Sequence, residues 1–243
     1  MKKALLFCCL LSVAGLAGCD TKYVEHDPEA LGLDYHPIQT GDYKIYKVVD
    51  IRYQNNVAKK DSFEMREVVD TSYYDQTNKL TYKVVRAIKR FDQAEWVEDS
   101  VMTVTKSDKH VLLTKDNTKY VKLVFPVQNG RMWLGDAYND HVVNNLETDP
   151  YLRKEPYTYT AVGEPYEVNG TTFPTTLTVI QGKPKNYLVQ LDDRKEVYAK
   201  GVGRIYRLFN RVVYCNDASC PQGVEYKLNG HERHEMLTSY GSR

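Results

Sequence analysis

Apolar and polar side chains alternate along most of the chain after residue 35. The clearest case is the segment 43–53, in which apolar residues recur at every second position and only Lys47 interrupts them: Tyr43, Ile45, Val49, Ile51 and Tyr53. A period of two is typical of a half-buried β-strand. We therefore predict a strand here, with that face turned toward the core.

Shorter stretches of the same kind follow, separated by polar turns such as Asn55-Asn56, 115–118 and Asn169-Gly170. The segment 62–74 fits either a strand or a short helix, and its β-branched residues favour a strand. The other expected strands are 80–88, 96–105, 110–114, 120–125, 157–161, 165–168, 175–181, 187–191, 196–199 and 202–214.

Because no helical period intervenes, these strands predict an antiparallel all-β domain over residues 35–229. A large antiparallel sheet must curl, close or stack to bury one face. We expect a strongly twisted sheet curled into a half-barrel, as in lipocalin-like or lipoprotein-carrier-like domains. A two-sheet β-sandwich is the alternative.

A long loop is expected between Pro126 and Pro150, covering one mouth of the sheet. Aromatic residues gather in and beside it at Phe125, Trp133 and Tyr138. Aromatic side chains on an irregular loop can line a ligand pocket. They can equally plug the end of a sheet as core, and we favour core because large aromatic side chains dominate core burial.

The two ends of the domain are polar. Residues 19–34 are expected to form a tether, and residues 230–243 a frayed tail. Within that tail, His231 and His234 would share one face of a helix and could bind a metal. Two imidazoles do not complete a tetrahedral site, so we predict no metal and no cofactor.

The first eighteen residues differ in kind from all that follows. Lys2 and Lys3 precede an apolar run from Ala4 to Leu16, which is too short to remain as a membrane-spanning helix. The run ends in Leu16-Ala17-Gly18-Cys19, which resembles the bacterial lipoprotein cleavage box. We predict a lipoprotein signal peptide over 1–18 and a diacylglyceryl, palmitate-bearing cysteine at Cys19, where several acyl chains would form a durable anchor.

Charge narrows the range of partners. The chain has 33 basic and 32 acidic residues, and the leader carries two of the basic ones. A near-neutral protein shows no electrostatic footprint for nucleic acid, so we expect no nucleic-acid partner.

Cys215 and Cys220 are the only cysteines beyond Cys19. In an exported protein this pair favours a disulfide that closes a short loop. The alternative, two thiol ligands of a metal site, lacks further ligands nearby.

Three blocks of sequence resemble uncharacterised outer-membrane lipoproteins of the Bacteroidota. They are Tyr35-His36-Pro37-Ile38 with Gly41-Asp42-Tyr43 and Tyr46; 122–127 with Gly130, Trp133, Gly135, Ala137, Tyr138 and Asn139; and 198–203. The chain departs from that pattern at Lys44, where an aromatic residue is common, and at Asp136, where asparagine is usual. The resemblance implies a cell-envelope protein and no particular chemistry.

Neither a Gly-x-Ser-x-Gly elbow nor a His-Glu-x-x-His motif occurs in the chain. We therefore expect a non-catalytic binding or assembly module at the outer membrane, which holds an envelope protein, a glycan or a lipid. A cell-surface hydrolase with dispersed catalytic residues is the alternative.

Overall fold

The computed structural model describes residues 27–139, 153–217, 219–220 and 225–243. Within them the chain forms two short helical segments, α2 (Pro28–Leu31) and the 3-10 helix η2 (Leu33–Tyr35), followed by strands. The strands are β1 (Asp42–Gln54), β2 (Val57–Tyr74), β3 (Leu80–Arg90), β4 (Val97–Lys106), β5 (His110–Lys115), β6 (Thr118–Val124), β7 (Met132–Leu134), β8 (Pro156–Val168), β9 (Thr171–Gln181), β10 (Lys185–Tyr187), β11 (Gln190–Ala199), β12 (Gly203–Tyr214) and β13 (Lys227–Ser242).

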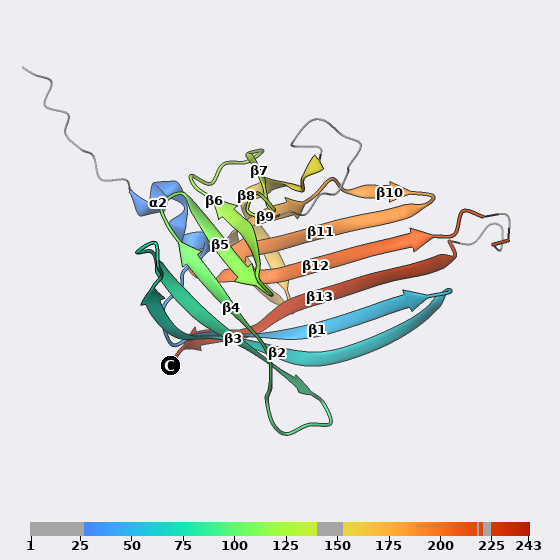
Figure 1. The fold of residues 1–243 in the computed structure, drawn as a ribbon, viewed down its shortest axis with the longest axis horizontal. Helices are drawn as coiled ribbons and strands as arrows, with labels where there is room; N and C mark the ends of the chain where they lie inside the picture. Colours follow the sequence, from blue (N-terminus) through green and yellow to red (C-terminus); the bar gives the residue numbers. More distant parts are fainter. Residues whose placement is uncertain (1–26, 140–152, 218, 221–224) are drawn as a thin grey trace, which may run out of the picture.

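All thirteen described strands belong to one antiparallel sheet, in the order β6-β5-β4-β3-β2-β1-β13-β12-β11-β9-β8-β7, with β10 paired to β11. The sheet curls into a half-barrel (Figure 1). Its two edges approach each other, since the amide of Val121 on β6 donates to the carbonyl of Gly135, just after β7, at 2.8 Å. The predicted all-β half-barrel is confirmed, and the sandwich alternative is not found.

Several turns lie where the sequence placed them. Asn55 and Asn56 join β1 to β2, and Asn169 with Gly170 joins β8 to β9. Both pairs have positive φ angles, 48° and 61° in the first and 49° and 74° in the second. Two successive positive φ values are what a two-residue hairpin requires, and Asn and Gly adopt them at low cost.

The face of β1 that turns inward is the opposite of the one predicted. Tyr46 and Val48 are fully buried, whereas Lys47 is exposed and Ile45 and Val49 are half-buried. The inward face also carries Lys44 and Asp50, so the interior of the half-barrel is charged. The predicted alternation of buried and exposed positions along β1 is correct. The choice of face is wrong, because it assumed that the interior is apolar.

The predicted polar tail is also wrong. Strand β13 pairs with β1 on one side and β12 on the other, and so lies in the middle of the sheet. Its inward side chains His231, Arg233 and Glu235 are paired with charges inside the half-barrel instead of facing solvent. Likewise, residues 192–195, which separate the predicted strands 187–191 and 196–199, lie within β11.

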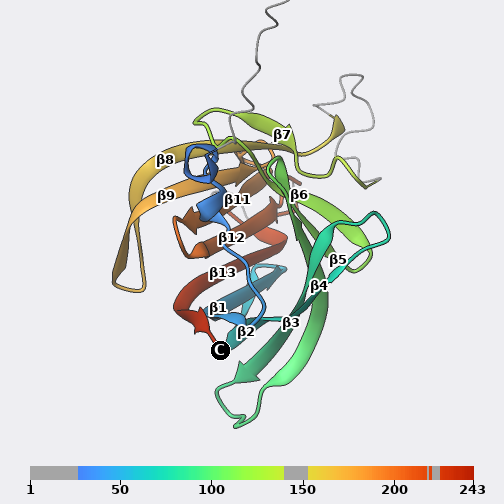
Figure 2. The same ribbon diagram turned by 90° about the vertical axis from the view of Figure 1, so that its left-hand side faces the viewer.

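The segment 27–41, part of which was predicted as tether, closes one end of the half-barrel (Figure 2). Its main chain is held by Lys106, which donates to the carbonyl of Leu33 at 2.8 Å, and by the amide of Gly201, which donates to that of Asp34 at 2.9 Å. Tyr35 is buried in the core. We call residues 33–41 the plug.

Candidate functional site: a charged chamber inside the half-barrel

A cavity of about 420 Å³ lies inside the half-barrel, between the plug and the strands β1–β6, β8, β9, β11 and β12. We call it the chamber. A second hollow of about 560 Å³, the outer groove, lies against Asp50, Arg52, Lys59, His231 and Arg233. Both hollows are lined by Arg86, Lys115, Arg207 and Phe209, so the chamber and the groove adjoin. Volumes of this size are typical of small-molecule sites.

One ionic cluster crosses the chamber from β2 to β12. Glu67 and Arg86 stand directly opposite each other on β2 and β3, and Arg86 donates to Glu67 at 2.7 Å. Arg204 on β12 reaches the same carboxylate at 3.1 Å and Glu235 at 3.2 Å. Arg204 also stacks over the ring of Tyr46, 4.9 Å from its centroid.

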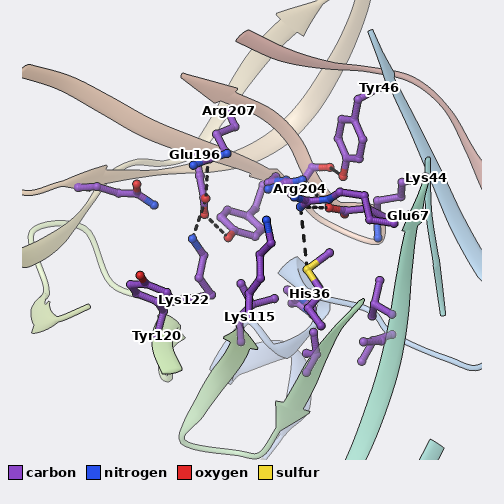
Figure 3. A pocket seen from close by; sticks show the side chains of 18 of the residues that line it. His36, Lys44, Tyr46, Glu67, Lys115, Tyr120, Lys122, Glu196, Arg204 and Arg207 are labelled. Carbon is purple, nitrogen blue, oxygen red and sulfur yellow. Dashed lines mark hydrogen bonds and ion pairs between the residues drawn. The ribbon is translucent and has the colours of Figure 1, made fainter. Parts of the chain in front are cut away.

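A second cluster centres on Glu196 of β11, which is 1% exposed. Lys122 donates a hydrogen bond of 2.7 Å to this carboxylate, and the hydroxyl of Tyr198 donates one of 2.6 Å to it. Arg207 Nε lies 3.6 Å from Glu196 Oε1. Figure 3 shows Lys122 and Arg207 reaching Glu196 from two sides. Burial alone would raise the pKa of Glu196, but Lys122, Arg204 and Arg207 lower it to about 2.

A third cluster holds Arg194. It donates two hydrogen bonds of 2.9 Å to Glu155 and two, of 2.7 and 3.2 Å, to Asp192. Arg211 Nε lies 3.3 Å from Asp192 Oδ2. Burial would lower the pKa of Arg194, but these two carboxylates raise it, so the group stays charged.

Cations outnumber anions along the chamber wall. Eight Lys and Arg side chains line it, compared with four Asp and Glu side chains. Counting Asp192 and Glu235, which are buried behind the lining, still leaves two more cations than anions. A concave cavity with this imbalance attracts negative charge.

Several nitrogen donors along the chamber wall have no acceptor. Lys44 makes neither a hydrogen bond nor a salt bridge with the described residues, and its ammonium lies where a Cβ on Gly203 would touch it. Arg86 Nε and Gln181 Nε2 are buried without a hydrogen-bond partner among those residues. His36 Nδ1 is also buried and unmatched, and it donates or accepts according to the tautomer of the ring. Buried polar groups are normally satisfied, so these unmatched donors point to an acceptor that the described residues do not supply.

The shifted pKa values of Lys44 and His36 are consistent with a positively charged chamber. Burial, with help from Arg204, lowers the pKa of Lys44, and Glu67 opposes this only in part. The pKa of His36 falls to about 3 through burial and the positive charges of Lys44 and Lys106. His36 is therefore neutral at pH 7 inside a positive field.

No protein-family model matches the chain, and no curated protein shows significant similarity to it. Among solved structures, a proposed exported protein of Bacteroides fragilis with a YmcC-like fold aligns with 85% of this chain and 98% of its own. The TM-score is 0.41 and the sequence identity 9%.

The aromatic residues considered for binding do not line the chamber. Phe125 and Trp133 belong to the hydrophobic core, and the indole nitrogen of Trp133 donates to the carbonyl of Val121 at 2.9 Å. Tyr138 is 57% exposed on the surface. The core interpretation of Phe125 and Trp133 is thus confirmed, and the three residues do not come together as a site.

Cys215 and Cys220 form the predicted disulfide, beside the end of β12. His231 and His234 point to opposite faces of β13, because residues three apart on a strand do so. His231 contacts Asp50, and His234 contacts Glu232 and Tyr206. The helical geometry of the metal hypothesis is therefore wrong, and the described residues hold no group of three or more potential metal ligands.

Cys19 lies outside the described residues, as do positions 140–152 of the predicted loop. None of the described helices is long and apolar enough to span a bilayer.

Sequence reasoning missed the chamber residues because a charged side chain in a strand normally indicates a solvent-facing position. One signal was available. Asp192, Arg194 and Glu196 alternate in sign at every second position, as do Arg233 and Glu235. Opposite charges on one strand face can pair with each other and with neighbouring strands, which makes a buried charged wall possible.

Proposed function

We propose that this protein is a non-catalytic binding module of the cell envelope that holds an anionic ligand in the chamber. The observation that carries the proposal is the set of unmatched donors, Lys44, Arg86 and Gln181 among them, in a cavity where cations outnumber anions. Leaving such groups unsatisfied costs free energy on folding, and an anion that accepts their hydrogen bonds recovers it.

We also propose that the protein is anchored at the outer membrane through acyl chains on Cys19. The leader sequence, the resemblance to Bacteroidota lipoproteins and the disulfide support this, since disulfides persist in oxidising compartments. A Cys19→Ser variant should lose the anchor while the fold is unchanged. We expect it in the soluble fraction of lysed cells, and its retention with membranes would contradict the anchor.

Native mass spectrometry of the protein purified from its own envelope tests the bound ligand. We expect an added anionic mass on the unsubstituted protein and on Lys47→Met, whose side chain is exposed on the outer face of β1. Lys44→Met should lose that mass. An unliganded protein that no anion in a screening panel stabilises would contradict the proposal.

The thermal stability of Lys44→Met provides a second test of the proposed anion site. Because Lys44 is a half-buried cation that forms no salt bridge with the described residues, replacing it with an apolar side chain of similar length should raise the thermal midpoint. A gain in stability with a loss of binding is typical of a residue kept for function.

A further inference from the structure

The chamber has one apolar wall. Val69, Val84 and Met102 stand directly opposite one another on β2, β3 and β4. Val104 and Leu113 form the next rung on β4 and β5. These five side chains line the chamber and pack in or against the hydrophobic core, so they form a continuous apolar surface facing the cavity.

The cationic part of the chamber borders this apolar wall. Lys44, Glu67 and Arg86 occupy one rung across β1, β2 and β3. Glu67 precedes Val69 by two positions, so the charged rung is the next inward-facing rung along β2. Pro37 and Ile38 of the plug also line the chamber. Apolar surface and unmatched donors therefore lie side by side in one cavity.

We propose that the ligand is an anionic amphiphile, an alkyl chain bearing a carboxylate or a phosphate. This inference rests on the anion-binding function proposed above. The alkyl chain lies against Val69, Val84 and Met102, and the head group accepts hydrogen bonds from Lys44 and Arg86 Nε. A purely polar anion would leave the apolar wall in contact with water, whereas a neutral lipid would leave the donors unsatisfied.

A chain-length series tests the alkyl part. The full chain carrying Cys19→Ser is titrated calorimetrically in detergent-free buffer with acetate, octanoate and dodecanoate. Burial of each methylene should tighten binding about fourfold until the wall is covered. Equal affinities along the series would overturn the amphiphile and leave the anion site intact, whereas no binding at any length would also overturn the proposed function.

The head group is tested at constant chain length. Dodecanoate and dodecyl phosphate should both bind more tightly than dodecanol, and their order distinguishes a free fatty acid from a phosphorylated lipid as the source. Dodecanol binding as tightly as the two anions would overturn the role given to Lys44 and Arg86.

Leu113→Trp tests the apolar wall in the protein itself. Leu113 is half-buried on the chamber side, and a larger side chain there should abolish the gain with chain length while acetate binding is unchanged. Val101→Trp on the exposed face of β4 is the matched control. If Leu113→Trp lowers the thermal midpoint strongly, Val104→Phe provides the same test. An unchanged chain-length dependence in the folded variant would contradict the proposed position of the alkyl chain.

Discussion

Glu196 is ionised inside the half-barrel because Lys122, Arg204 and Arg207 offset the cost of removing its charge from water. Such an arrangement is costly to break, since each partner depends on the others. The same is true of Glu235, which is fully buried and paired with Arg207 and Arg233. These residues hold the chamber wall in shape, whereas Lys44 and Arg86 Nε remain available to a ligand.

Glu196→Gln should lower the free energy of unfolding at pH 7 by about 3 kcal/mol, because it leaves Lys122 without its counter-charge. The folded-state pKa of Glu196, about 2, is lower than the ordinary value of 4.5. The ionised group therefore stabilises the fold above about pH 4.5, and this stabilisation is lost as the pH falls toward 2. Urea unfolding at pH 7 and at pH 3 should show a smaller acid loss in the variant than in the unsubstituted protein.

Glu98→Gln, an exposed change on β4, is the matched control and should alter neither stability nor its pH dependence. Equal acid losses for all three proteins would show that Glu196 is not held ionised by its neighbours.

Trp133→Ala should destabilise the fold by about 3–5 kcal/mol, because it removes a buried indole and its hydrogen bond to Val121. Tyr138→Ala, five residues away and exposed, should change stability by less than about 0.5 kcal/mol. Thermal unfolding of both variants checks this. A mild effect at Trp133 would return that side chain to consideration as part of a binding surface.

At the scale of the elements, turn chemistry and alternation were enough to predict most strands. Asn55-Asn56 and Asn169-Gly170 are local signals, since positive φ angles select those residues wherever the turn occurs. The face that a strand turns inward, and the burial of that strand in the sheet, are not set by local sequence. The face of β1 that turns inward, and the inclusion of 227–242 in the sheet, depend on charges supplied by other strands, such as Asp50 for Arg233. A single strand's sequence does not contain that information.

Leu237→Ala tests the central position of β13. Leu237 is 4% exposed and pairs with Tyr46, so the change should cost about 2–5 kcal/mol. Tyr240→Ala, near the end of the same strand and 51% exposed, should cost much less. Chemical denaturation compares the two. Similar small effects would favour the frayed tail that the polar sequence suggested.

At the scale of the whole molecule, the plug converts an open half-barrel into a chamber with one closed end. Gly32 immediately precedes the plug. Its φ of +76° suits glycine, and its position leaves no room for a Cβ, because a methyl group of Val127 would lie 2.9 Å from it. The plug is therefore held by a close backbone approach as well as by hydrogen bonds.

Gly32→Ala should displace the plug. The variant adds a steric clash with Val127 to the backbone strain of about 1 kcal/mol that alanine has at such a φ. Gly170→Ala, at a φ of +74° with open space around it, carries the backbone strain alone. Hydrogen exchange of residues 27–41 should accelerate in Gly32→Ala and not in Gly170→Ala. Equal exchange in the two variants would mean that the plug does not depend on this contact.

Helix α2 and the plug are the first described parts of the chain after the proposed anchor. With Cys19 fixed in a bilayer, any tension between the membrane and a partner pulling on the domain would reach α2 and the plug before it reached the sheet. A few hydrogen bonds, those of Leu31 with Val127, Leu33 with Lys106 and Asp34 with Gly201, would bear that load. Mechanical force on the anchor would therefore act directly on the floor of the chamber, and ligand retention would become sensitive to stretching of the envelope.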